Sequence, residues 1–121
     1  RRRYLDIVLA AWFGVGVVQT FVDLQGASGA SYRFRLAPGG EVSSPIAGNY
    51  AYIREEPEGF TVLSVAATND LSSAIAEWKR AVAKYGEMHL YTRLNVSAAV
   101  REAEQQDIAI HYKPRRTRQK A

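Results

Sequence analysis

Two short runs of apolar residues, separated by a polar segment, form the clearest pattern in the chain. The runs cover residues 48–53 and 60–65, and the polar segment between them contains Pro57 and Gly59. β-Branched and aromatic side chains pack well on a pleated sheet, and a polar segment with Pro and Gly is typical of a turn. The pattern predicts a β-hairpin.

A helix is predicted directly after this hairpin. Asn69 and Asp70 carry short polar side chains of the kind that cap free backbone N–H groups, and Gly86 is suited to the left-handed end of a helix. Between these signals the apolar residues recur at i, i+4, i+7 and i+11, which is one stripe of an amphipathic helix. They are Leu71, Ile75, Trp78 and Val82.

Two further strands are predicted from alternating apolar and polar residues. Residues 32–36 alternate strictly, which places Arg33 and Arg35 together on an exposed face. Residues 21–24 fit a hairpin with this strand. In the segment that follows the helix, one face is expected to be buried (Met88, Leu90 and Leu94) and the other to be wet (His89, Tyr91 and Arg93).

A second helix is predicted from Asn95 or Ser97, either of which can cap it, to His111. Most of its residues are polar, and we expect them to form a solvated face. They are Arg101, Glu102, Glu104, Gln105, Gln106 and Asp107.

The strand–turn–strand–helix pattern resembles a GIY-YIG nuclease domain, in which a Gly-x-Tyr strand pairs with a Tyr-x-Gly strand that leads into a helix. The first motif corresponds to Gly48-Asn49-Tyr50, the second to Ser64-Val65-Ala66 and the closing motif to Tyr112-Lys113-Pro114-Arg115. The resemblance covers residues 20–117. It implies an α+β fold with a small mixed or antiparallel sheet flanked by helices, preceded here by an apolar segment, 1–19, and followed by a short basic tail end, 118–121.

The resemblance also assigns catalytic positions, most of which have changed. In that family two tyrosines act on water, a helix arginine steadies phosphate charge and a glutamate binds one divalent ion. Here these positions, with the closing asparagine, hold Tyr50, Ser64, Ala74, Gln105 and Thr117. Alanine cannot hold phosphate charge, and glutamine is a poor ligand for a hard dication. The resemblance therefore implies a pseudo-nuclease rather than an enzyme, with weak metal-dependent nuclease activity as a residual alternative.

The charge is unevenly distributed. The chain has a net charge of +4, but three arginines open it and five cations lie between 113 and 120, which leaves residues 4–112 with more acids than bases. Basic ends of this kind meet phosphate, meet a lipid headgroup or remain solvated. The candidate phosphate-binding residues are Arg33, Arg35, Lys113, Arg115, Arg116, Arg118 and Lys120.

An apolar run without charged side chains extends from Ile7 to Val22. As a helix it would be about 24 Å long, short of the roughly 30 Å of a bilayer core. We expect it to insert into a membrane, to lie at the membrane surface, to form part of the core or to meet another subunit. The residues concerned are Ile7, Val8, Leu9, Trp12, Phe13, Val15, Val17, Val18, Phe21 and Val22.

Other chemistry is disfavoured. The chain has no cysteine, which excludes disulfides, thiolate zinc sites and cysteine nucleophiles. His89 and His111 lack the spacing of metal ligands, so no metal is expected. Gly14-Val15-Gly16 is not completed to a dinucleotide-binding loop, so no cofactor is expected either.

Two functions follow. The first is an accessory or scaffold subunit that is membrane-associated or part of a larger protein complex. The alternative is a non-catalytic nucleic-acid-binding module that contacts phosphate through Arg33, Arg35 and the basic C-terminal tail. The first predicts localisation at a membrane, and otherwise the protein is expected in the cytoplasm.

Overall fold

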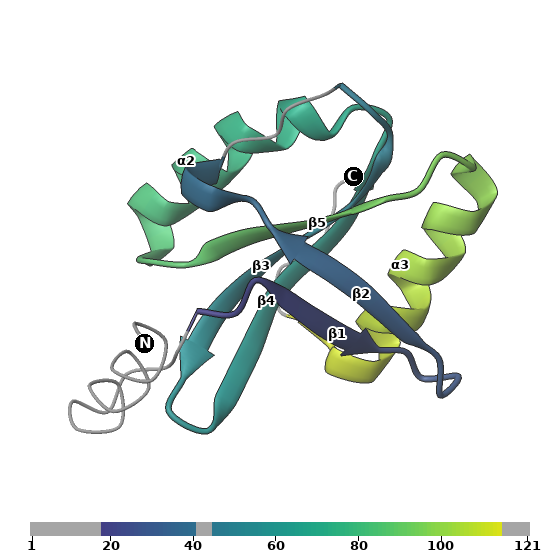
Figure 1. The fold of residues 1–121 in the computed structure, drawn as a ribbon, viewed down its shortest axis with the longest axis horizontal. Coiled ribbons are helices and arrows are strands. Elements are labelled where there is room, and N and C mark those ends of the chain that lie inside the picture. Colours follow the sequence, from purple (N-terminus) through teal and green to yellow (C-terminus); the bar gives the residue numbers. More distant parts are fainter. Residues whose placement is uncertain (1–17, 41–44, 115–121) are drawn as a thin grey trace.

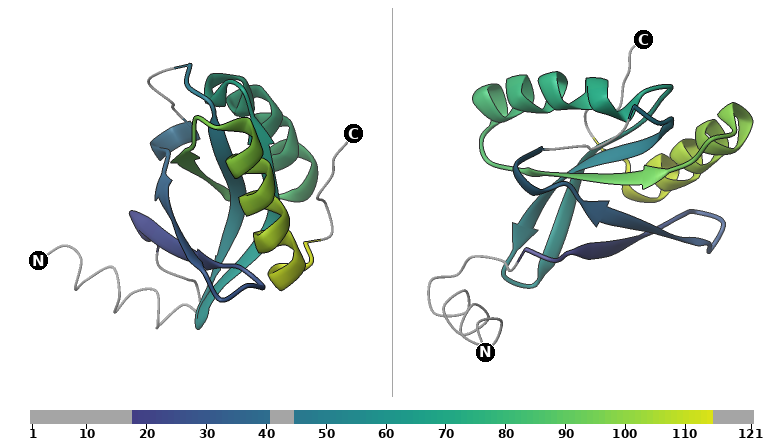
Figure 2. Two further views of the ribbon diagram at one scale, coloured as in Figure 1. Left: turned by 90° about the vertical axis from the view of Figure 1, so that its right-hand side faces the viewer. Right: turned by 45° about the horizontal axis from the view of Figure 1, so that its top comes forward.

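The computed structural model describes residues 18–40 and 45–114, which form an α+β fold with a five-stranded sheet and two α-helices (Figure 1). The strand order is β1-β2-β5-β3-β4, and every neighbouring pair is antiparallel. The sheet is strongly curled, so that β1 and β2 cross the direction of β3 and β4 (Figures 1 and 2). The predicted α+β class is confirmed, and the sheet is antiparallel rather than mixed.

The predicted central hairpin consists of β3 (Gly48–Glu56) and β4 (Gly59–Thr68). Its turn closes at Gly59, which has a φ of 144°, a conformation that side chains with a Cβ rarely adopt. Tyr52 pairs with Ser64 and Ile53 pairs with Val62, so that Leu63 is an extra residue in β4. This β-bulge bends the edge strand β4 beside the charged end of β3, Arg54–Glu56.

The second predicted hairpin consists of β1 (Phe21–Gln25) and β2 (Ser31–Leu36). Its loop is fastened to the last helix, because Asp107 accepts hydrogen bonds from the Ser28 backbone N–H (2.9 Å) and hydroxyl (2.6 Å). The Tyr32 hydroxyl donates to the same carboxylate at 2.7 Å. The backbone N–H of Gln25 donates to the Tyr112 hydroxyl at 3.0 Å. The hairpin and α3 (Ala98–Tyr112) therefore hold one another in place.

β5 (His89–Leu94) lies between β2 and β3 and joins the two hairpins into one sheet. Gly48 pairs with Leu94 at its end, where the backbones come so close that a Cβ at Gly48 would collide with the Arg93 carbonyl oxygen. A glycine is therefore needed at the start of β3 for close packing rather than for backbone freedom.

The two helices cover opposite faces of the central strands. α3 packs Ile108 against a core that includes Ala51, Ile53, Val65 and Tyr91. The other face carries a smaller core, formed with α2 (Ala74–Tyr85) and the short 3-10 helix η2 (Leu71–Ser73). Its buried members are Ala37, Tyr50, Leu71, Ala74 and Leu90. Because successive strand residues point to opposite faces, β3 contributes to both cores in turn.

Both predicted helices are present, and their predicted ends lie close to the observed ones. Asp70 accepts a hydrogen bond from the Ser72 N–H and caps η2, and α2 begins one turn later. Of the two proposed caps for the last helix, Ser97 is the one that accepts from Val100. A further 3-10 helix, η1, covers Pro38–Gly40 after β2.

The expectation that β5 has one wet face was wrong. Tyr91 is fully buried in the core under α3, because β5 is a central strand with a neighbour on each side and a core on each face. Leu94, expected to be buried, is 66 % exposed at the strand end.

The expected solvated face of the last helix was wrong in part. Arg101 is only 6 % exposed, and Asp107 holds the β1–β2 loop. Glu104 is half-buried, with an oxygen 2.9 Å from the Arg93 Nε, whereas Glu102 and Gln106 are exposed as expected.

The apolar run that begins at Ile7 lies mostly outside the described residues. Of its members, Val22 is buried in the core and belongs to β1, whereas Val18 and Phe21 are exposed. No helix within 18–40 or 45–114 has the length and apolar character needed to cross a bilayer. The proposed domain boundary at 117 and the tail end at 118–121 also lie outside the described residues.

Candidate functional site

Of the positions that the resemblance assigns to catalysis, Tyr50 points into the core under α2. It is 8 % exposed, and its hydroxyl donates a hydrogen bond to Glu77 Oε1 at 2.6 Å. Burial, together with this bond to a carboxylate, raises the pKa of Tyr50 well above that of a free tyrosine. Ala74 lies in the same apolar cluster. Tyr50 is therefore a neutral hydroxyl. Ala74, at the position where the resemblance expects an arginine, brings no positive charge to it.

The other positions that the resemblance assigns do not converge on Tyr50. Ser64 is half-buried and stands opposite Tyr52, on the same face as Tyr50. Gln105 lies on α3 and donates from its Nε2 to the Val65 carbonyl oxygen at 3.3 Å, so it packs on the other face of the sheet. Thr117 lies outside the described residues. The sheet thus separates Gln105 from Tyr50.

Glu77 is a partner of Tyr50 that the sequence analysis did not single out. It lies three residues after Ala74 on α2, a spacing that puts two side chains on the same face of a helix. That spacing was the available signal, since a residue at i+3 from Ala74 must also face Tyr50. The carboxylate at this place repels phosphate instead of attracting it.

The candidate phosphate-binding cations are not gathered in one place. The Arg33 guanidinium donates to both carboxylate oxygens of Asp23, at 2.9 and 3.2 Å, and lies 5.3 Å from the centre of the Phe21 ring. This hydrogen bond lowers the pKa of Asp23, so the carboxylate stays charged opposite the arginine. Arg35 is exposed on the same face of β2. Lys113 ends α3, and Arg115, Arg116, Arg118 and Lys120 lie outside the described residues.

A polar network at the start of β3 joins several elements. Asn49 is fully buried, donates to the Arg101 carbonyl oxygen at 2.9 Å and accepts from the Asn95 side chain at 2.9 Å. The Arg101 guanidinium donates to Asn69 Oδ1 at 2.6 Å and to the Val96 carbonyl oxygen at 2.7 Å. Asn69 and Asn95 resemble helix caps in the sequence but serve here as partners of buried groups, so the network is structural.

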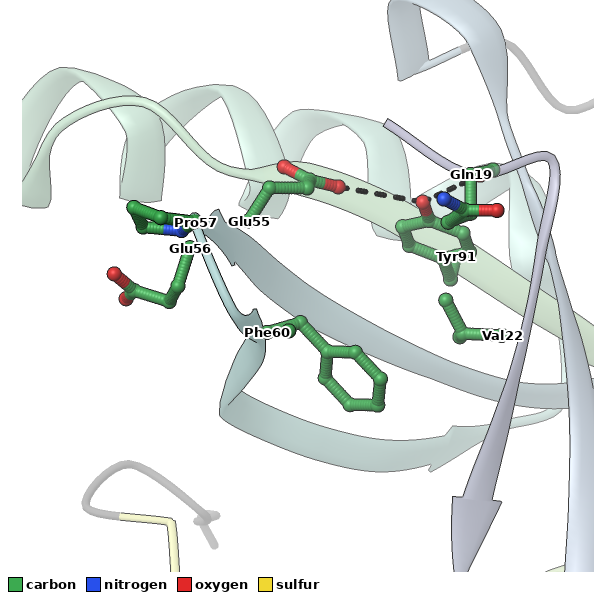
Figure 3. Close-up of a pocket in the computed structure, with 8 residues that line it drawn as sticks. Gln19, Val22, Glu55, Glu56, Pro57, Phe60 and Tyr91 are labelled. Carbon is green, nitrogen blue, oxygen red and sulfur yellow. Dashed lines mark hydrogen bonds between the residues drawn. The ribbon is translucent and has the colours of Figure 1, made fainter. Parts of the chain in front are cut away.

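In the part of the chain that the structure describes, two pockets lie beside the β3–β4 hairpin. The first, which we call the acidic pocket, has a volume of about 290 Å³ and is drawn in Figure 3. Glu55 and Glu56 line it from β3, with Gln19 and Val22 from the start of the described chain and Tyr91 from β5. The Tyr91 hydroxyl donates to the Gln19 carbonyl oxygen at 2.6 Å and lies 3.3 Å from Glu55 Oε2.

Within the acidic pocket, the Glu55 carboxylate is bonded to other residues of the protein. Glu55 Oε1 lies 2.8 Å from His89 Nδ1, so both of its oxygens have partners. Burial, reinforced by the charge of Glu55, raises the pKa of Tyr91 above its ordinary value. Glu55 and His89 do not amount to a metal site, since no three His, Asp or Glu side chains of residues 18–40 and 45–114 group together.

The second pocket, which we call the basic pocket, has a volume of about 410 Å³ and lies at the outer edge of β4. Arg54 of β3 and Lys113 at the end of α3 are the charged residues that line it. Its other lining residues are mainly aromatic, aliphatic or hydroxyl-bearing, from β3, β4, α2 and the end of α3: Tyr52, Thr61, Val62, Leu63, Ser64, Ala81, Tyr85, Met88, Tyr112 and Pro114.

Comparison of the chain with protein-family models, with curated proteins and with solved structures finds no match in any of the three.

Proposed function

We propose that this chain is a non-catalytic domain of the GIY-YIG-like kind and acts as a small accessory or scaffold subunit. One observation carries the proposal: Tyr50 is buried, bonded to Glu77 and packed with Ala74. Hydrolysis of a phosphodiester needs groups that stabilise an anionic transition state. A neutral tyrosine beside a carboxylate offers no such stabilisation, which leaves binding as the role of the domain.

An exposed apolar surface supports a role in protein assembly. Leu94, Val96, Val100 and Ile46 are 66, 77, 46 and 37 % exposed. They lie on neighbouring segments, because the Asn95 N–H donates to the Ala47 carbonyl oxygen at 3.1 Å and Ser97 begins α3 between the two valines. We call these four residues the apolar end. Grouped exposed apolar side chains are typical of protein–protein contacts.

The absence of catalysis is tested directly. Purified protein is incubated with single- and double-stranded DNA and RNA in Mg²⁺ and in Mn²⁺, beside a Tyr50→Phe variant. We expect no cleavage above the background in either sample. Cleavage by the natural chain that is lost in the variant would show that Tyr50 is catalytic and would overturn the proposal.

The accessory role is tested by assembly. In cells that express the natural chain, we expect it to elute in an assembly larger than one chain or to sediment with membranes. Leu94→Glu combined with Val96→Glu should release it, because two charges cannot be buried at the contact without cost. Ile110→Glu is the matched control, since Ile110 is 60 % exposed on α3 and lies outside the apolar end. A monomeric, freely soluble natural chain would contradict the role.

Membrane association is tested separately with the natural chain and a variant that lacks residues 1–19. If the apolar run is an anchor, the natural chain stays in the membrane pellet through high salt and alkaline carbonate, and the shortened chain does not. Release by salt alone would assign membrane binding to the basic ends.

The alternative, nucleic-acid binding, is favoured by the exposed Arg35 and weakened by the pairing of Arg33 with Asp23. Binding through phosphate weakens steeply with salt, because neutralised phosphates release counterions. A steep salt dependence that Arg35→Gln reduces by about one unit of slope would support this alternative. Absence of binding at low salt would remove it.

A further inference from the structure

We propose that the basic pocket binds a small amphipathic anion, a molecule with an aromatic or aliphatic body and one carboxylate, sulfonate or phosphate group. This site is independent of the accessory role. Its volume of about 410 Å³ lies in the range of roughly 300–1,000 Å³ that is usual for small-molecule pockets.

The charge of the pocket selects an anion. Arg54 and Lys113 line it, and none of its lining residues is an Asp or Glu. The described residues contain three ion pairs, and neither cation belongs to one of them. Glu56 accepts from the hydroxyl of the lining residue Thr61 at 3.0 Å, but it lines the acidic pocket instead. Among the described residues, therefore, no ion pair neutralises Arg54 or Lys113, and both cations can interact with an anion bound in the basic pocket.

The guanidinium of Arg54 is held in position without losing its charge. Its Nε donates to the Glu87 carbonyl oxygen at 3.2 Å and its Nη2 to the Tyr85 carbonyl oxygen at 3.0 Å. Both acceptors are backbone groups at the end of α2, where a cation is favoured by the helix dipole. A fixed donor costs less conformational entropy on binding than a mobile surface arginine.

Lys113 is placed by the end of the last helix. It has a φ of 50° and a ψ of 55°, and its N–H donates to the Ala109 carbonyl oxygen at 2.7 Å, so the chain turns at this residue. The chain turns here directly after α3, and Lys113 lines the same pocket as Arg54. The two cations come from elements that are almost 60 residues apart in the sequence, roughly half of the chain.

The walls of the pocket suit the body of the ligand. Met88 is 3 % and Val62 is 6 % exposed to solvent, and Tyr52 is an aromatic residue of the lining. Leu63 lines the same wall because the bulge in β4 leaves it without a partner in β3. Apolar and aromatic walls with a few convergent polar groups are characteristic of ligand pockets, and here the polar groups are cationic.

A small molecule fits better than a peptide strand added to the edge of β4. Strand addition needs free backbone groups along the edge. The Val65 carbonyl oxygen already accepts from Gln105, and the bulge at Leu63 interrupts the regular spacing of the strand. The edge is thus partly occupied, whereas the pocket beside it is open to a compact ligand.

The test uses decanoate below its micellar concentration as the probe and decyltrimethylammonium as its cationic counterpart. The full chain is labelled with ¹⁵N, and amide shifts are followed by NMR during titration. We expect decanoate to shift the amides of Leu63, Ser64 and Tyr85, and to leave those around the acidic pocket in place. Binding of the cationic probe at the same amides with equal affinity would overturn the proposal.

Two variants locate the charge and the space. Lys113→Asn removes one cation at a left-handed position that asparagine tolerates, and Ala81→Leu fills part of the pocket from α2. Each is expected to weaken decanoate binding about tenfold. Lys113→Asn removes one charge-assisted contact, and Ala81→Leu removes space for the alkyl chain of decanoate. Lys79→Gln is the control, because Lys79 is exposed on α2 and does not line the pocket. Equal affinities in all four proteins would refute the site.

Discussion

The two pockets beside the β3–β4 hairpin contrast in what their charges do. In the acidic pocket Glu55 is bound by His89 and Tyr91, so its charge is used within the protein. In the basic pocket Arg54 bonds only to backbone carbonyl oxygens, among its described hydrogen bonds. Arg54 and Glu55 are consecutive residues of one strand, and strand alternation directs them to opposite faces. One strand thus supplies a stabilising contact on one side and a binding group on the other.

The largest expected effect comes from replacing one aromatic residue in each pocket, Tyr91 in the acidic pocket and Tyr85 in the basic pocket. Tyr91→Ala should lower the free energy of unfolding by about 3–5 kcal/mol, because Tyr91 is fully buried and its loss leaves a cavity. Tyr85→Ala should cost less than about 1 kcal/mol, since Tyr85 is 47 % exposed. Urea unfolding measures both. Equal losses would mean that the basic pocket is part of the core.

Removing one charge from each pocket should also lower the free energy of unfolding more in the acidic pocket than in the basic pocket, but by smaller amounts. Glu55→Gln should cost about 1–2 kcal/mol, because the side chain is only 10 % exposed and its partners lose a charged acceptor. Lys113→Asn should change stability by less than about 0.5 kcal/mol, since Lys113 is exposed. A stability loss for Lys113→Asn as large as that for Glu55→Gln would argue against a ligand-binding role for the lysine.

The proposed ligand should itself act on stability. At ten times its dissociation constant, decanoate should stabilise the natural chain by about 1.4 kcal/mol through mass action. Lys113→Asn should gain much less at the same concentration. An equal gain in both proteins would place decanoate somewhere other than the basic pocket.

A further loss of stability is expected at alkaline pH. The folded protein raises the pKa of Tyr91 through burial and the charge of Glu55. Such a group contributes stability that is complete below about pH 10, the pKa of an unfolded tyrosine, and is lost as the pH rises further. Urea unfolding at pH 8 and pH 11 should show this loss, and Tyr91→Phe should show a smaller one. An undiminished loss in the variant would assign the titration to Tyr50 or Tyr32, whose pKa values are also raised.

The local signals of the sequence predicted the elements well, because they depend on neighbours along the chain. The turn at Pro57 and Gly59, the cap at Asp70 and the cation pair on β2 required no knowledge of the sheet. Tyr91 was wrongly expected to be exposed, because alternation separates the two faces of a strand but does not show that both faces are buried. That depends on the place of β5 in the centre of the sheet.

Arg101 shows a second limit of the sequence pattern. Its buried face follows the spacing i, i+4, i+7 and i+11, but polar residues occupy the first two places of the stripe: Arg101, Gln105, Ile108 and Tyr112. The spacing alone could have identified this face. The basic pocket had no comparable signal, because it depends on the bulge at Leu63 and on the left-handed turn at Lys113.

The attachment of the β1–β2 hairpin to α3 has a consequence for the order of folding. Ser28 and Asp107 are 79 residues apart in the chain, and Gln25 and Tyr112 are 87 apart. Contacts across such long loops form late, because the loop-closure entropy is lost before the contact is gained. On a ribosome, β1 therefore waits for α3 before its loop can be fixed. This hairpin should also be the first part of the folded protein to detach.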